Sequence, residues 1–235
     1  MIRRGLVASF ACLIATLAIW FWAASHVDPT ATVPVHWGPN GPDRFGSGAE
    51  AVRILALFPA ILAGVALLMA VAPRIEPFRR NLQMGARLYL ISWIGVDLLI
   101  VATTFVIARQ MTLPVGDYSD LWVRGIVAGS FLLIVATADS MPKTRRNFLL
   151  GVRTRWTLTS DLSWEKTQRL AGRLLMLVGL WGVAAAFLFD LKHMIWMITV
   201  PLLVVVVICC VYSYFVWRAD PIQGPNKTLG DIDHA

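Results

Sequence analysis

The residues best suited to chemistry near the N-terminal end of the chain lie in the segment VPVHWGPNGPDRFGSG, residues 33–48. His36, Asp43 and Arg44 supply an imidazole, a carboxylate and a guanidinium within a few positions of one another. His36 could sense pH, because imidazole changes charge near neutral pH, or it could stabilise the loop through a hydrogen bond. The three could also be the acid–base groups of a membrane enzyme. The prolines and glycines around them demand tight turns, which predicts a compact loop.

A metal site is a further use to consider for this segment. His26 and Asp28 precede His36 in the chain, but their spacing matches no zinc site of recognised geometry. The three cysteines, Cys12, Cys209 and Cys210, fall within apolar runs, where neither a disulfide framework nor a metal site is expected. The chain also lacks a zinc-protease helix motif, a phosphate-binding glycine loop and a nucleophile elbow. We therefore expect no metal, no cofactor and no enzyme.

Asp97 is the second candidate, because it lies near the middle of a long apolar run, residues 88–108. An ionised carboxylate at the centre of a bilayer costs at least ~2.5 kcal/mol, so such residues face the interior of a helix bundle and find a partner. Asp97 is expected to be protonated, hydrogen-bonded to a hydroxyl such as that of Ser130, or open to a polar cavity. A structural hydrogen bond is favoured, and a proton or ligand pathway through Asp97 is the alternative.

The third candidate is the segment GVRTRWTLTSDLSWEKTQRLAGR, residues 151–173, which is polar and basic in an apolar chain. Apolar and polar residues alternate over 152–159, which predicts a short strand or an extended interfacial segment. Thr159, Ser160 and Asp161 are typical helix caps, so a helix should begin near Leu162. Apolar and basic stripes at helical spacing then predict an interfacial helix that lies along the membrane and turns into the next span.

Apolar residues dominate the rest of the chain, and they decide which elements position these groups. The 235-residue sequence is 57% hydrophobic and 15% charged, with a mean hydropathy of +0.67, values typical of a membrane protein. A span needs about 20 apolar residues, which predicts an all-α polytopic fold with about six transmembrane helices near residues 6–26, 52–72, 88–108, 121–138, 172–190 and 194–216. The first is interpreted as a retained anchor rather than a cleaved signal peptide, because its apolar run is too long for the latter.

Lysine and arginine positions predict the orientation of these spans. Most of them fall on one side if both termini are cytoplasmic, as the positive-inside rule requires. Basic residues facing the lipids of the inner leaflet account for most of the net charge of +7, so no nucleic-acid partner is needed to explain it. We expect one membrane domain over 1–218, with an outer loop at 27–51 and cytoplasmic loops at 73–87 and 139–173, and a flexible cytoplasmic tail over 219–235.

Two of these segments resemble the SdpI family, bacterial membrane proteins linked to immunity against secreted peptide toxins. The first resemblance is carried by Asn147, Gly151, Arg153, Thr154, Trp156, Thr157 and Leu158, with Trp164, Thr167 and Gly172 downstream. The second is carried by Pro34, His36, Trp37, Asn40, Gly41, Pro42, Asp43 and Arg44. One departure is Gly48, because many family members have a lysine shortly after the glycine-serine pair.

The resemblance implies a multi-pass immunity protein in the bacterial cytoplasmic membrane. It implies a peptide toxin as a partner on the outer face and leaves open a cytoplasmic regulator, while the oligomeric state stays undecided. A small proton-coupled transporter using Asp97, or a membrane enzyme, are the alternatives. The residues expected to bind a toxin or ligand, or to signal, are His36, Trp37, Asp43, Arg44, Asp97, Asn147, Gly151, Arg153, Thr154, Trp156, Thr157, Trp164 and Thr167.

Overall fold

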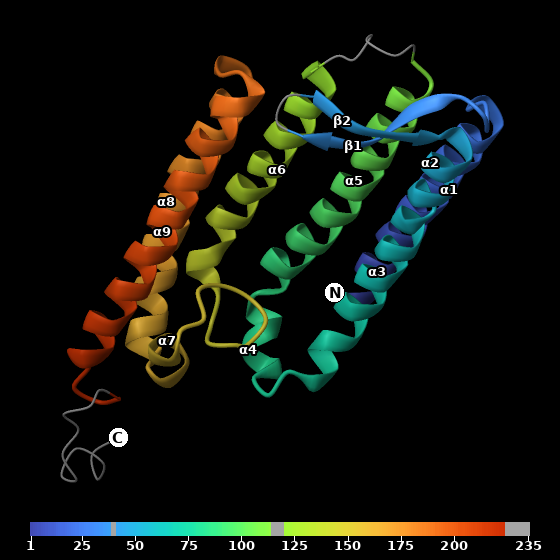
Figure 1. Cartoon of the computed structure of the whole chain (residues 1–235). Helices are drawn as coiled ribbons and strands as arrows, with labels where there is room; N and C mark the ends of the chain where they lie inside the picture. The colour runs from blue at the N-terminus through green and yellow to red at the C-terminus, as the bar shows by residue number, and fades with distance from the viewer. Residues whose placement is uncertain (39–40, 114–119, 224–235) are drawn as a thin grey trace.

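The computed structural model of the chain describes residues 1–38, 41–113 and 120–223, and it is mainly helical (Figure 1). Its elements follow one another in this order: α1 Ile2–His26, β1 Thr32–Gly38, β2 Gly41–Ser47, α2 Gly48–Leu55, α3 Leu57–Ile75, α4 Arg79–Met84, α5 Ala86–Met111, α6 Asp120–Ser140, the 3-10 helix η1 Met141–Lys143, α7 Arg155–Thr159, α8 Asp161–Leu188 and α9 Leu191–Arg218.

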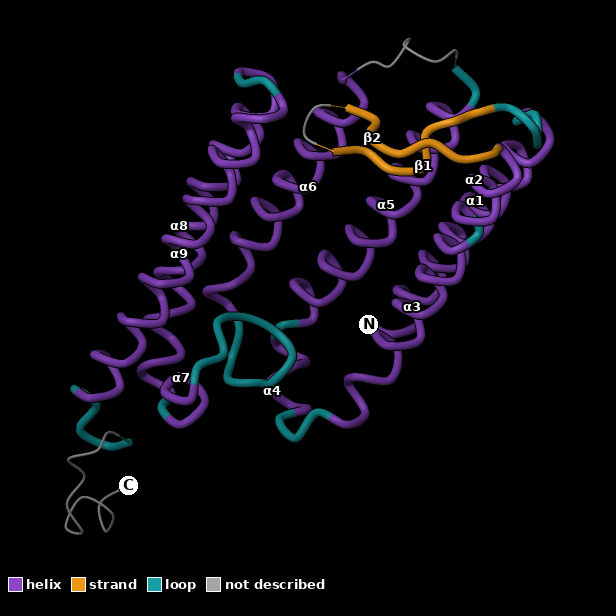
Figure 2. Tube along the Cα trace, viewed as in Figure 1, coloured by secondary structure: helices purple, strands orange, loops and turns teal. Residues whose placement is uncertain are grey.

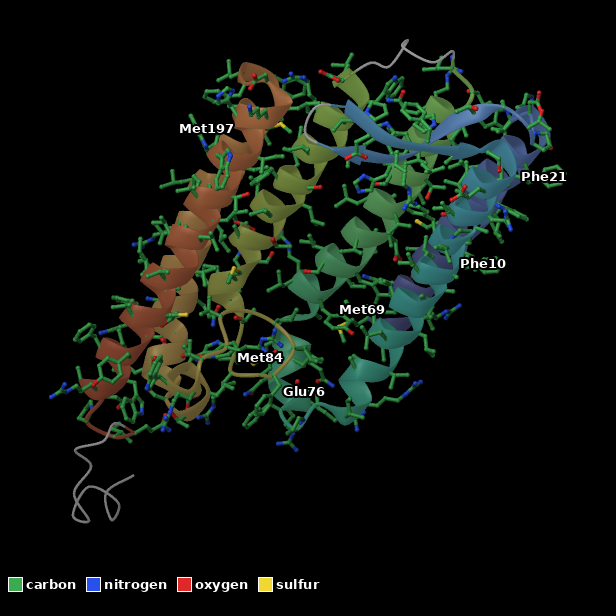
Figure 3. All side chains as sticks on the ribbon, in the orientation of Figure 1. Phe10, Phe21, Met69, Glu76, Met84 and Met197 are labelled. Atoms are coloured by element: carbon green, nitrogen blue, oxygen red, sulfur yellow. The ribbon has the colours of Figure 1, made fainter. Side chains whose placement is uncertain are left out.

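Six helical segments of the described chain are long and apolar enough to cross a membrane: α1, α2 with α3, α5, α6 with η1, α8 and α9. Large apolar side chains cover their outer surfaces, as Phe10 and Phe21 do on α1, where they are 65% and 68% exposed (Figure 3). Exposed apolar side chains at this density suit contact with lipid rather than water. The protein is therefore a polytopic helical membrane protein, as the sequence predicts.

The spans pack in two groups of three. In the first group α1 contacts α3 and α5, and in the second α8 contacts α6 and α9, while α5 and α6 join the groups. Figure 2 shows the two strands lying across one end of the molecule, with α4 and α7 at the other. We call these the hairpin end and the strap end. The strap is residues 144–160, which run from η1 through α7 to the start of α8.

The loop between the first two spans folds as an antiparallel hairpin, in which β1 pairs with β2 from Thr32 and Ser47 to Gly38 and Gly41. Pro39 and Asn40, where turns are expected, lie outside the described residues. Ser47 caps the following helix, because its hydroxyl accepts a hydrogen bond from the Glu50 N–H at 3.2 Å. The compact outer loop expected from the sequence is therefore a two-stranded hairpin.

The prediction of an interfacial helix before the fifth span is wrong. α8 is a single helix from Asp161 to Leu188, so it enters the fifth span without an intervening turn. The stripe expected to face the membrane surface is buried in the protein instead: Trp164 is 2% exposed, and Gln168 and Ala171 are 0% exposed. The strap packs over this stripe, so the stripe contacts protein and not lipid headgroups.

The prediction of a strand or extended segment over 152–159 is also wrong for its second half. Residues 155–159 form the short helix α7, which starts from a capping box. The Thr154 hydroxyl accepts from the Thr157 N–H at 3.1 Å, and the Thr157 hydroxyl accepts from the Thr154 N–H at 2.9 Å. This reciprocal pair satisfies backbone donors at the helix start and overrides the alternating pattern.

The expected flexible tail over 219–235 begins as ordered chain. Asp220 is 5% exposed and accepts a hydrogen bond from the Ser160 hydroxyl, and the Gln223 side chain accepts from the Asp161 N–H at 2.7 Å. The first residues after α9 therefore pack against the start of α8. Residues 224–235 lie outside the described part of the chain.

Candidate functional site

The strap is held by side chains that bond to its backbone, and Asn147 is the central one. Asn147 is 0% exposed, and its amide oxygen accepts from the N–H groups of Leu149 and Leu150 at 2.9 and 2.7 Å. Its amide nitrogen donates to the Arg145 carbonyl at 2.8 Å. Because this stretch has no helical or sheet hydrogen bonds of its own, Asn147 supplies partners that the backbone would otherwise lack.

Glu76, a residue that the sequence analysis did not single out, performs the same task from the loop between α3 and α4. It lies at the strap end of the molecule (Figure 3) and is 3% exposed. Its carboxylate accepts from the Phe78 N–H at 3.0 Å and from the Phe148 N–H at 3.1 and 3.2 Å. Asn81 adds a donor to the Arg146 carbonyl at 2.8 Å. These bonds join the strap, which leads into α8 of the second helix group, to α4 and to the loop that follows α3 of the first group. An acidic residue at the end of an apolar span, among basic residues, is the sequence signal that could have identified Glu76.

Gly151 and Gln168 fit together at the middle of the strap. The Gln168 side chain, from α8, accepts from the Val152 N–H at 3.0 Å and donates to the Val152 carbonyl at 2.9 Å. Gly151 has a φ of +93°, and a Cβ there would lie 2.6 Å from the Gln168 amide oxygen. Glycine is required at this position both for the backbone conformation and for the close approach of Gln168.

Most of the threonines and tryptophans of the expected site hold the strap in place through hydrogen bonds and are buried or half-buried rather than exposed. Thr157 is 0% exposed, and its hydroxyl also donates to the Val152 carbonyl at 3.0 Å, while the Thr154 hydroxyl lies 3.0 Å from the Ser213 hydroxyl on α9. Trp164 donates its indole N–H to the Thr144 carbonyl at 3.1 Å. Thr167 is buried, and its hydroxyl has no hydrogen-bond partner among the described residues.

The outward face of the strap is basic and aromatic. Arg153 and Arg155 are exposed, and the Arg153 guanidinium donates to the Phe148 carbonyl. Trp156 packs edge-on against Tyr214 of α9, with 5.3 Å between ring centroids. These side chains, unlike the buried ones that bond to the strap backbone, remain available to lipid headgroups or to another molecule.

At the hairpin end, His36 and Asp43 form a contact across the two strands. The His36 Nδ1 and an Asp43 carboxylate oxygen are 2.5 Å apart, and both side chains are more than half exposed. Arg44 is exposed beside them and pairs in register with His36. His26 lies 2.8 Å from the Trp22 carbonyl of its own helix rather than joining His36. The contact between His36 and Asp43 therefore fits a histidine, His36, that stabilises the hairpin.

Gly48, the position where the sequence departs from the family pattern, is buried where the hairpin meets α2. Its N–H donates to the Ala31 carbonyl at 2.9 Å, and a Cβ would lie 2.1 Å from the Asp28 carbonyl oxygen. A lysine could not occupy position 48 without moving the backbone of the loop.

Asp97 lies in the first helix group, 0% exposed. One carboxylate oxygen accepts from the Ser9 hydroxyl of α1 at 2.6 Å, and the Ser9 oxygen accepts from the Trp93 indole at 2.8 Å. The other oxygen has no hydrogen-bond partner among the described residues. The expectation that Ser130 could be the partner is wrong, because the Ser130 hydroxyl donates to the Ile126 carbonyl of its own helix. The group ties α1 to α5 and lies far along the chain from the strap and hairpin residues.

The C-terminal part of the chain matches a known protein family. Residues 143–213, which include the strap, α7, α8 and most of α9, match the sequence model of the SdpI/YfhL protein family. The chain is also 30% identical over 96 residues to the immunity protein SdpI of Bacillus subtilis (strain 168), an alignment that covers 41% of this chain and 45% of the relative. No solved structure matches the chain. The matched family region begins at residue 143, so the resemblance of the hairpin segment stays a prediction.

Proposed function

We propose that the chain is an SdpI-like membrane immunity protein that protects a bacterium against a secreted peptide toxin, because residues 143–213 match the SdpI/YfhL family model and 96 residues of the chain are 30% identical to an immunity protein. The observation that carries the proposal is that the family match falls on the strap, α8 and most of α9, where Asn147, Gln168 and Thr157 bond to the strap backbone. A non-enzymatic role agrees with this, since the strap's polar groups are engaged by its own backbone.

In this proposal both termini and the strap face the cytoplasm, and the hairpin faces outward. The exposed Arg153 and Arg155, with the partly exposed Trp156, then form a surface at the inner leaflet that contacts anionic lipids and an acidic cytoplasmic regulator. The residues over 1–218 act as one membrane domain.

The experiment is survival of a toxin-sensitive bacterium that expresses the full chain. The challenge is a panel of purified secreted membrane-active peptides, together with concentrated culture medium of Bacillus subtilis strain 168, the organism of the relative. We expect higher survival than in cells with the empty vector. No protection from any of these preparations, at a verified amount of protein in the membrane, contradicts the proposal.

Arg153→Ala and Trp156→Ala separate the outward face of the strap from its fold. We expect both variants to reach the membrane in normal amounts and to lose protection, because neither side chain is buried. Lys166→Ala, which removes another exposed cation on α8, is the matched control and should retain protection.

A second candidate function is a small proton-coupled transporter, favoured by the buried Asp97 carboxylate with one unpartnered oxygen. In that case Asp97→Asn abolishes function in a protein that still folds, while Arg153→Ala and Trp156→Ala have little effect. The same survival assay and panel of variants therefore distinguishes the two.

A further inference from the structure

A cavity lies beneath the hairpin, between the ends of α5, α6 and α9. Its volume is about 330 Å³, and its walls are mainly apolar: Trp37 from β1, Val123 and Val127 from α6, and Met194 and Ile198 from α9. This volume is at the lower end of the range of ligand pockets, about 300–1,000 Å³. It suits one or two side chains of a ligand rather than a whole folded partner.

A second cavity of about 200 Å³ adjoins the first, because Trp37, Gln110 and Val123 line both. It extends between α5 and α6, where Ile107 and Ile126 contribute further apolar walls. The two cavities are neighbours that share Trp37, Gln110 and Val123 as wall residues. We call the two together the hairpin cavity.

Two residues that line the hairpin cavity each carry a buried polar group without a hydrogen-bond partner among the described residues. These groups are the Trp37 indole N–H, a donor, and the amide oxygen of Gln110, an acceptor on a residue that is 3% exposed. An unpaired polar group in an apolar site costs about 1–3 kcal/mol. A donor and an acceptor in one cavity match the carbonyl and the N–H of an amide.

We propose that the hairpin cavity binds an apolar segment of a peptide, with Trp37 donating to a peptide carbonyl and Gln110 accepting from a peptide N–H. An acyl chain would fill the same apolar space but would leave both polar groups unpaired. Asp120, which also lines the cavity, adds a carboxylate that disfavours an acidic ligand. The identity of this peptide as a toxin rests on the proposed function, whereas the peptide chemistry of the site does not.

Direct binding is tested with the full chain in lipid nanodiscs, labelled with 5-fluorotryptophan. The probe is a leucine–phenylalanine–leucine tripeptide blocked by an acetyl group and an amide. Trp37→Phe identifies the Trp37 fluorine signal, and we expect that signal to shift and saturate as probe is added. Gln110→Leu should weaken probe binding by about tenfold, the effect of losing one hydrogen bond. Val123→Trp, which fills the space shared by the two cavities, should abolish binding.

Gln83→Leu makes the same chemical change at an exposed position of the strap end and should leave binding unchanged. A Trp37 signal that does not saturate, or an affinity indifferent to both Gln110→Leu and Val123→Trp, overturns the proposal. An equal shift with decane, unaffected by Gln110→Leu, identifies an acyl-chain site and also overturns it.

The survival assay separates this inference from the proposed function. If the native chain protects and Gln110→Leu and Val123→Trp protect equally well, the toxin is not bound in the hairpin cavity, and the inference fails while the function stands. If the native chain gives no protection but the tripeptide binds with the expected dependence on Gln110, the immunity function fails and the peptide site stands.

Discussion

The two ends of the molecule treat buried polar side chains in opposite ways. At the strap end, Asn147 and Gln168 are fully buried, and each bonds to backbone groups of the strap. At the hairpin end, Gln110 and the Trp37 indole are buried without partners among the described residues. The buried hydroxyls of Ser140 and Thr167 are exceptions at the strap end, since they have no partner among the described residues. The contrast therefore concerns the side-chain amides: those of Asn147 and Gln168 bond to the strap backbone, whereas the Gln110 amide oxygen has no described partner.

This difference separates residues that maintain the fold from residues that can bind a ligand. A satisfied buried polar network fixes one conformation, whereas an unsatisfied group destabilises the free protein until something pairs with it. The strap motif therefore maintains the cytoplasmic-side architecture in our proposal, and recognition belongs to the hairpin end. Substitutions that remove polar groups should accordingly have opposite effects on stability at the two ends.

The largest loss of stability is expected for Asn147→Leu, which removes three hydrogen bonds while keeping the side-chain size. Leaving the Leu149 and Leu150 N–H groups and the Arg145 carbonyl unpaired should cost at least ~3 kcal/mol in the free energy of unfolding. The measurement is thermal unfolding of the purified protein in detergent. Asn81→Leu removes a single bond to the Arg146 carbonyl and should cost distinctly less. Equal losses of stability in the two variants would show that Asn147 does not contribute more than Asn81 to holding the strap.

Gly151→Ala should have the next largest effect, and Gly41→Ala provides its control at the hairpin end. Both glycines have positive φ, +93° and +103°, so both substitutions strain the backbone by about 1–3 kcal/mol. At Gly151 the new Cβ also collides with the Gln168 amide oxygen 2.6 Å away, while at Gly41 no atom of the described residues lies within 4 Å. Thermal unfolding should show a greater loss for Gly151→Ala, and a greater loss for Gly41→Ala would contradict the tight fit of Gln168.

A smaller effect, dependent on pH, is expected where the chain after α9 meets α8. Burial raises the pKa of Asp220, but hydrogen bonds from the Ser160 hydroxyl and from the N–H groups of Gln223 and Ile222 outweigh it and lower the pKa below its ordinary value. A carboxyl whose pKa is lowered by folding stabilises the protein above its unfolded pKa of about 4, and the stabilisation is lost as pH falls through the folded pKa.

Asp220→Asn should therefore lower the unfolding temperature at pH 7, and the difference from the native chain should shrink as pH falls below 4. Asp43→Asn, which removes the exposed contact with His36 at the hairpin end, should have little effect on stability at pH 7, because exposed ion pairs contribute about 0–1 kcal/mol. A loss with Asp220→Asn that persists unchanged in acid would assign the effect to something other than the carboxylate.

The positions of the spans could be predicted from the sequence, because bilayer thickness sets the length of an apolar run. The start of α8 could also be predicted, since Ser160 caps it through the Ser163 N–H at 2.9 Å. The course of the strap could not be predicted in this way. Its alternation predicts a strand, whereas the Thr154–Thr157 capping box, visible in the sequence as two threonines three positions apart, starts a helix there.

The partners of the candidate site residues could not be predicted from the sequence, because they come from distant parts of the chain. Asn147 and Gln168 have backbone partners, which leave no trace in residue type, and Glu76 reaches Phe148 across 72 positions. Ser9 is the partner of Asp97 from 88 positions away, so only the packing of α1 against α5 reveals it. Gln110 looks like an ordinary polar residue at the end of a span until the hairpin covers it.

The most direct test of the contrast between the ends is the unfolding temperature of two matched variants, Gln168→Leu and Gln110→Leu, in the same detergent. We predict that Gln168→Leu destabilises the protein by about 1–3 kcal/mol, because it leaves the Val152 N–H unpaired and removes one of the two hydrogen bonds to the Val152 carbonyl, the other coming from Thr157. We predict that Gln110→Leu is neutral or stabilising, because it removes an amide oxygen that has no partner among the described residues. Equal destabilisation by the two substitutions would show that Gln110 is already satisfied within the protein and would contradict a hairpin end with free hydrogen-bonding groups.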